Sequence, residues 1–82
     1  MKKLVETIIR EIVDHPDKVQ VEEIKGEMTT ILEVSVAPSD MGKVIGKEGR
    51  TAKAIRTILN AAGMRMNRRI EYEIVNTEDK RK

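Results

Sequence analysis

Two glycines three residues apart, Gly46 and Gly49, constrain the fold of this chain more than any other sequence feature. Apolar residues at helical spacing lie on both sides of them, over 41–45 and over 50–62. Because glycine adopts backbone conformations that are closed to other residues, the pair predicts a tight turn between a short and a long helix. Glycine also lacks Cβ, so another backbone can approach this turn closely.

The rest of the chain predicts one more helix and three strands. Helical spacing over 2–14 ends before Pro16, and strict alternation predicts strands over 28–37 and 68–75. A further strand over 19–24 has an alternation that slips by one near Glu22, which suggests a bulge. We expect Asp40 to cap the short helix and Gly63 to end the long one.

This order of elements indicates an α+β fold with two layers. A short turn joins the first two strands, so they are expected to be antiparallel, while the strand–helix–helix–strand unit predicts parallel neighbours. The sequence therefore predicts a three-stranded mixed sheet covered on one face by three helices, in the order α-β-β-α-α-β. The 82 residues suffice for one domain, expected over 1–75, with a polar tail over 76–82.

Positive charge is concentrated in the middle of the chain. Residues 1–39 hold five Lys/Arg and eight Asp/Glu, a net charge of −3, and residues 70–82 hold three and four, a net charge of −1. Residues 40–69 hold eight Lys/Arg and two Asp/Glu, a net charge of +6. This pattern suggests a local site for a polyanion, and a solvated basic helix face is the equally simple alternative.

Composition excludes several classes of function. The chain has no cysteine and one histidine, His15, which stands beside a proline with no cluster of metal-ligand or catalytic residues around it. We therefore expect a non-enzyme without metal or cofactor, located in the cytoplasm and without a signal peptide or membrane segment. Tyr72 is the only aromatic residue, which argues against RNA modules that stack bases on aromatic platforms.

The glycine turn has the chemistry of a phosphate site. The start of the following helix offers unpaired N–H groups and the positive end of a dipole, and Lys47, Arg50 and Lys53 add cations. The spacing fits neither a Walker A loop nor a Rossmann fingerprint. Glu48 is the one acidic residue of the turn, and it is expected either to point away from phosphate or to cap the helix.

The run from Val44 to Gly49, followed by Ile55, resembles the V-I-G-x-x-G core of KH domains. The order of elements is similar to the type II KH arrangement, and residues 1–75 resemble the small bacterial single-domain KH proteins of the KhpA (YlqC) family. One departure is Ala52, where the KH pattern has isoleucine, which implies a shallower groove floor.

The resemblance implies a groove that holds about four nucleotides of single-stranded RNA, with the backbone on the loop. Its implied walls are the short helix, the loop, the long helix and the last strand. It also implies an RNA chaperone or post-transcriptional regulator that acts as a homodimer or with a Jag-type KH partner, KhpB. The residues expected to bind RNA are Gly42, Lys43, Ile45, Gly46, Lys47, Glu48, Gly49, Arg50, Lys53, Arg56, Arg68 and Arg69.

Two other functions remain open from the sequence. The KH scaffold can serve as a protein-interaction or dimerisation module, and the two helices around 46–49 can also be interpreted as a DNA-binding helix-turn-helix. The second interpretation ranks last, because the basic residues crowd the turn itself and a strand follows. Arg65, Arg68 and Arg69 either extend the basic track or form a solvated turn.

Overall fold

The computed structural model describes residues 1–76, and the last residues of the expected polar tail, 77–82, lie outside this range. The helices and strands follow the predicted order. They are α1 (Lys2–Ile12), β1 (Gln20–Lys25), β2 (Thr29–Val36), α2 (Met41–Ile45), α3 (Arg50–Arg65) and β3 (Arg69–Asn76), with short 3-10 turns at Pro16–Lys18, Pro38–Asp40 and Lys47–Gly49.

The three strands form one mixed sheet in the order β1-β2-β3. β1 is antiparallel to β2, and β2 is parallel to β3 with Leu32 opposite Tyr72. The bulge expected near Glu22 is wrong, because every residue from Gln20 to Lys25 pairs one-to-one with β2. The apolar residues of β1 break the alternation because Ile24 lies on the outer face of the sheet, where it is 51% exposed.

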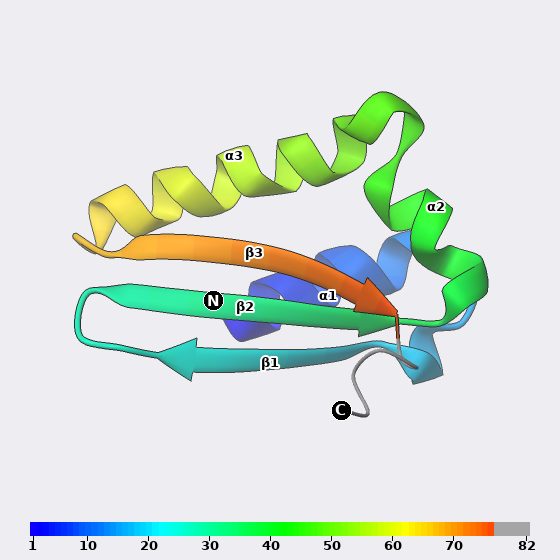
Figure 1. The fold of residues 1–82 in the computed structure, drawn as a ribbon, viewed down its shortest axis with the longest axis horizontal. Coiled ribbons are helices and arrows are strands. Elements are labelled where there is room, and N and C mark those ends of the chain that lie inside the picture. The colour runs from blue at the N-terminus through cyan, green and yellow to red at the C-terminus, as the bar shows by residue number, and fades with distance from the viewer. Residues whose placement is uncertain (77–82) are drawn as a thin grey trace.

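The helices cover one face of the sheet, and α3 runs along β3 while α1 lies behind the strands (Figure 1). Alternate β2 residues, Leu32, Val34 and Val36, are fully buried beneath them. From α1, Val5 and Ile9 enter the same core, as the helical spacing predicts. The two-layer α+β fold with one core is therefore confirmed.

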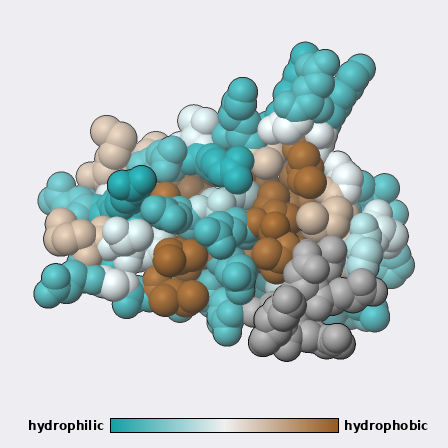
Figure 2. Space-filling view, viewed as in Figure 1, coloured by the Kyte–Doolittle hydropathy of each residue, from teal (hydrophilic) through white to brown (hydrophobic). Residues whose placement is uncertain are grey.

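The opposite face of the sheet points toward the viewer in Figure 2, which shows a mainly hydrophilic surface with separate hydrophobic patches. Because only one face of the sheet is buried, apolar and polar residues alternate along β2.

Among the described residues, no helix combines the length and the apolar character that crossing a membrane requires.

Asp40 has a different role from the expected helix cap, because its side chain makes no capping hydrogen bond with α2. The carboxylate accepts hydrogen bonds from the backbone N–H of Asp14 (3.2 Å) and of His15 (3.0 Å), and the His15 Nδ1 lies 3.2 Å away. Burial acts to raise the pKa of Asp40, but these hydrogen bonds and the His15 charge together lower it below its ordinary value. Asp40 thus fastens the segment after α1 to the start of α2.

Gly63 does not end α3, which continues to Arg65. A Cβ at this position would lie 2.6 Å from the Arg68 carbonyl oxygen and 2.6 Å from Ile70 Cγ1. The glycine is needed because α3 and the start of β3 approach each other closely here, and not because the helix stops.

Candidate nucleic-acid interface

The loop between α2 and α3 has the strained backbone that its glycines predict. Gly46 and Gly49 have φ values of 81° and 75°, and Glu48 between them has 56°. A Cβ on Gly46 would lie 2.7 Å from the backbone nitrogen of Thr51, whereas one on Gly49 would have nothing within 4 Å. At position 46, both the positive φ and the lack of room for a Cβ therefore require glycine. At position 49, the positive φ alone favours glycine.

Cations surround this loop at the start of α3. Lys47, Arg50 and Lys53 are all exposed, and the first N–H groups of the helix lie beside them. Glu48 does not cap α3; its carboxylate pairs with the Arg50 guanidinium at 3.2 Å, with both side chains exposed. Such an exposed pair contributes at most about 1 kcal/mol, so an arriving phosphate can replace Glu48 as the partner of Arg50.

The short helix α2 presents a partly apolar surface beside the loop. Val44 is fully buried, whereas Ile45 is 38% exposed. Gly42 is exposed, and a Cβ there would meet nothing within 4 Å. Lys43 pairs with Asp14 across 3.4 Å at the surface. Gly42 and Ile45 are therefore open to solvent close to the loop in sequence, and the Lys43 ammonium group has an exposed carboxylate as its partner.

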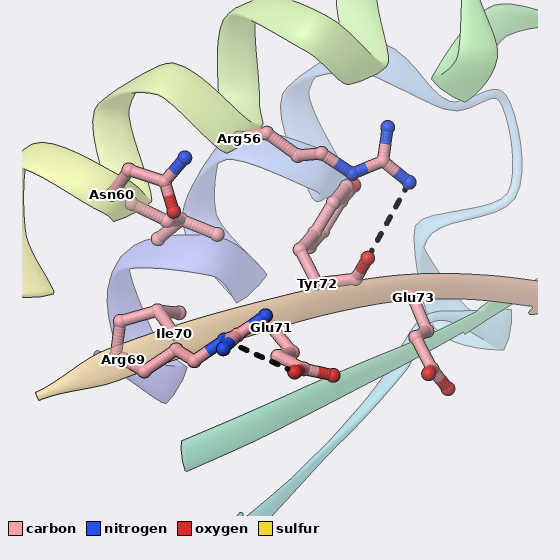
Figure 3. A pocket seen from close by; sticks show the side chains of 8 residues that line it. Arg56, Asn60, Arg69, Ile70, Glu71, Tyr72 and Glu73 are labelled. Atoms are coloured by element: carbon pink, nitrogen blue, oxygen red, sulfur yellow. Dashed lines mark hydrogen bonds and ion pairs between the residues drawn. The ribbon is translucent and has the colours of Figure 1, made fainter. Parts of the chain in front are cut away.

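A cavity of about 660 Å³ lies farther along α3, between this helix and β3. Figure 3 shows Arg56 and Asn60 reaching toward it from α3, and Arg69, Glu71 and Glu73 lining it from β3. The described lining comes from α3 and β3, and no residue of α2 or the loop belongs to it. Two of the four expected groove walls therefore form this cavity.

Arg56 bridges the two walls at Tyr72. Its Nη2 donates to the Tyr72 carbonyl oxygen at 3.4 Å, and its Cζ lies 5.7 Å from the centre of the Tyr72 ring (Figure 3). The ring is only 5% exposed, so it serves as core packing and not as an open stacking surface. Burial raises the pKa of Tyr72 to about 12, although the Arg56 charge acts to lower it.

The structure distributes the predicted site residues over three places. The first nine, from Gly42 to Lys53, gather around the loop, and Arg56 and Arg69 line the cavity. Ala52 is 6% exposed and does not line the cavity, so the shallower groove floor expected from this departure stays a prediction. Asn60 was missed, although its position four residues after Arg56 places it on the same helix face.

Arg68 is the predicted site residue that points elsewhere. Its guanidinium donates to two carbonyl oxygens of the β1–β2 connection, those of Gly26 (2.6 Å) and Glu27 (3.0 Å), and to that of Thr29 (3.2 Å) at the start of β2. It also donates to the Thr30 hydroxyl at 3.0 Å. These bonds occupy the guanidinium and give Arg68 a structural role.

We expect Arg68→Ala to lower the free energy of unfolding by about 1–3 kcal/mol, because several charge-assisted hydrogen bonds are lost together. Thermal unfolding followed by circular dichroism measures this. Arg65→Ala is the matched control, because Arg65 is exposed at the end of α3, and it should change stability by less than about 0.5 kcal/mol. Unchanged melting of Arg68→Ala together with weaker RNA binding would contradict the structural role.

Comparison with known proteins identifies the family of the chain. Residues 2–74 match the family model described as KhpA/KhpB, KH domain. The chain is 59% identical to the RNA-binding protein KhpA of Clostridium acetobutylicum, over 92% of this chain and all of the relative. It is 49% identical to the KhpA of Aquifex aeolicus, over 92% and 95% of the two chains, and 48% identical to that of Chlamydia caviae, over 98% and 100%. No solved structure gives a match.

Proposed function

Because this chain belongs to the KhpA/KhpB family of KH domains, we propose that it holds about four nucleotides of single-stranded RNA on the loop 46–49 and along the α3–β3 cavity. Relatives that share about half of its sequence are RNA-binding proteins by name. The chain is a binding domain and not an enzyme, as the sequence predicts.

The observation that carries this proposal is the loop itself. Gly46 and Gly49 have positive φ, and the loop stands at the start of α3 among three exposed cations. A phosphate on this loop gains charge-assisted hydrogen bonds from backbone and side chains together. The cavity then lies along the path of the strand, with Arg56 and Asn60 on one wall as donors to bases or phosphates.

Self-association or binding to a partner protein would raise the affinity for RNA. Four nucleotides bind weakly to one domain, and a second linked domain increases affinity through effective concentration. We therefore propose that the protein acts as a homodimer or with a KhpB-type partner, in RNA chaperoning or post-transcriptional regulation. Leu4 on α1 and Ile58 on α3 are 43% and 49% exposed, which suits a protein contact. Sedimentation velocity, alone and with the partner, tests this part.

Fluorescence anisotropy with short labelled oligonucleotides tests the RNA-binding proposal. An unstructured RNA should bind more tightly than a blunt hairpin stem, because a groove of this kind contacts unpaired bases. With about three phosphates neutralised, log K against log salt should have a slope near about −2. Equal affinity for single strand and stem would contradict the proposal and favour the helix-turn-helix interpretation.

Gly42 provides a finer test of where the strand runs. It stands in the helical part of α2, and nothing inside the protein requires a glycine there. Alanine should raise the free energy of unfolding by up to about 1 kcal/mol, because glycine is unfavourable in helices. The added methyl group should weaken RNA binding several-fold if the strand crosses α2. Melting temperature and anisotropy measure the two effects, and unchanged affinity would place the strand away from this helix.

A further inference from the structure

The end of the molecule farthest from the glycine loop carries an open cavity of about 610 Å³, lined by Met28, Met64, Asn67, Arg68 and Arg69. Here the β1–β2 connection, the last turn of α3 and the start of β3 come together, at the left of Figure 1. Met64 is 76% exposed and Met28 66%. Pale brown atoms at the same end of Figure 2 stand among hydrophilic ones. We call Met28, Met64 and Arg69 the methionine platform.

The backbone holds the parts of the platform together. The Arg69 N–H donates to the Met28 carbonyl oxygen at 2.8 Å, and the Asn67 N–H donates to that of Met64 at 3.2 Å. The Arg68 guanidinium fastens the connection before β2 through its bonds to Gly26, Glu27 and Thr29. The two methionines are thus exposed on a backbone that is already ordered, which reduces the entropy lost when a ligand binds.

The chemistry of the platform suits a nucleobase. A thioether is polarisable and makes favourable contacts with aromatic rings, and an arginine guanidinium stacks on planar groups. The chain has no Trp or Phe, and its one Tyr is buried. The His15 ring is half-exposed, but it lies against Asp40 at the start of α2. At the platform, exposed methionine sulfurs and guanidinium planes are therefore the surfaces available for stacking an unpaired base. The Arg69 side chain is 76% exposed and pairs with Glu71 across 3.3 Å, an exposed contact weak enough for a phosphate to replace.

The platform adjoins the α3–β3 cavity at one shared residue. Arg69 lines both this cavity and the α3–β3 cavity. The 16 residues of α3 span about 24 Å between the glycine loop and Met64. A strand that starts on the loop and follows α3 and β3 therefore reaches the platform if it is longer than the footprint at the loop.

We propose that the methionine platform is a second RNA subsite, which stacks one unpaired nucleobase of a strand that already occupies the loop and the α3–β3 cavity. This inference rests on the proposed function. It assigns to the methionines, and not to an aromatic side chain, the stacking of a base beyond the first four nucleotides.

Anisotropy with a four-nucleotide and an eight-nucleotide uridine RNA tests the inference in wild type and in the double variant Met28→Ser, Met64→Ser. The variant should bind the longer RNA at least about fivefold more weakly than wild type does, and the shorter RNA equally well. A longer strand binds more tightly simply because it can be placed on the site in more positions. The ratio of wild-type to variant affinity, taken at each RNA length, does not contain this effect. Ile24→Ser, at a half-exposed apolar residue on the outer face of the sheet, is the matched control and should bind both RNAs as wild type does.

Oxidation gives an independent readout. Hydrogen peroxide should oxidise Met28 and Met64 more slowly when the eight-nucleotide RNA is bound, and the four-nucleotide RNA should give no such protection. Met66 is 49% exposed and lines a different cavity, so it is the internal reference in the same mass-spectrometric measurement.

The outcomes separate this inference from the proposed function. If the double methionine variant keeps the wild-type affinity for both RNAs, the platform is not a subsite, although the loop can still be one. If neither RNA binds wild type, both proposals fail. If the variant changes sedimentation behaviour and leaves RNA affinity unchanged, the platform is a protein contact and the inference is overturned.

Discussion

Replacing Lys47 and Glu48 with aspartate should leave much of the RNA unbound at protein concentrations that just saturate the wild type. The lysine change reverses one charge in the loop, where phosphate is expected to lie, and the double variant keeps both glycines. We expect a loss of affinity of at least about tenfold, equivalent to about 1.4 kcal/mol. Anisotropy with an unstructured RNA measures it.

The fold should tolerate this double change. Both side chains are exposed, and Glu48 has a φ of 56°, a conformation that aspartate adopts more readily than glutamate. Circular dichroism and melting temperature should therefore match the wild type. Lys3→Asp is the matched control, since it makes the same charge change at an exposed position of α1 and should bind RNA nearly as wild type does. If RNA affinity survives in a folded double variant, the loop is not the phosphate site.

Gly46→Ala should cause the largest loss of stability among single changes in the loop. The backbone at Gly46, with φ 81° and ψ 168°, belongs to a region that is essentially restricted to glycine, and forcing another residue into it costs about 1–3 kcal/mol. The new Cβ would also press against the Thr51 side chain and its backbone nitrogen, at about 1–3 kcal/mol. We expect a total of roughly 2–6 kcal/mol, measured by urea unfolding.

Gly49→Ala is the comparison variant, because Gly49 lies in the milder left-handed helical region, with φ 75° and ψ 13°. Gly49 also has positive φ, but a Cβ there has open space, so alanine should cost only about 1–2 kcal/mol. Equal stability of the two variants would show that the contact with Thr51 is relieved by a small movement. A Gly46→Ala protein that melts as wild type does would contradict the loop geometry itself.

The sequence predicts the elements of this fold because each has a local cause. Helical spacing, strand alternation and the glycine pair are read from neighbouring residues, and the structure confirms the order that they imply. The errors concern contacts between distant segments. Gly63 belongs to the interior of α3 because β3 passes against it, and Asp40 binds the segment after α1, 25 residues away in sequence at His15. Neither contact has a local pattern.

In the candidate site, too, features with a local cause are predictable from the sequence, and contacts between distant segments are not. Positive φ at Gly46 and Gly49 is foreseeable from the motif, and so is the cluster of cations at the start of α3. The hydrogen-bond partners of each arginine side chain are not foreseeable, because they depend on which acceptors the folded chain brings near. Arg68 meets carbonyl oxygens of the β1–β2 connection and of the start of β2, 39 to 42 residues away in sequence, and Arg56 meets Tyr72.

Amide chemical shifts of isotopically labelled protein, recorded while a four-nucleotide single-stranded RNA is added, test the central claim most directly. The account predicts that the largest changes fall on the amides of residues 42–50, with further changes at Arg56, Asn60 and the start of β3. Residues of the outer sheet face, such as Glu22 and Ile24, should keep their positions. Changes centred on that outer face, with the loop 46–49 unaffected, would contradict the claim that the glycine loop holds the RNA backbone.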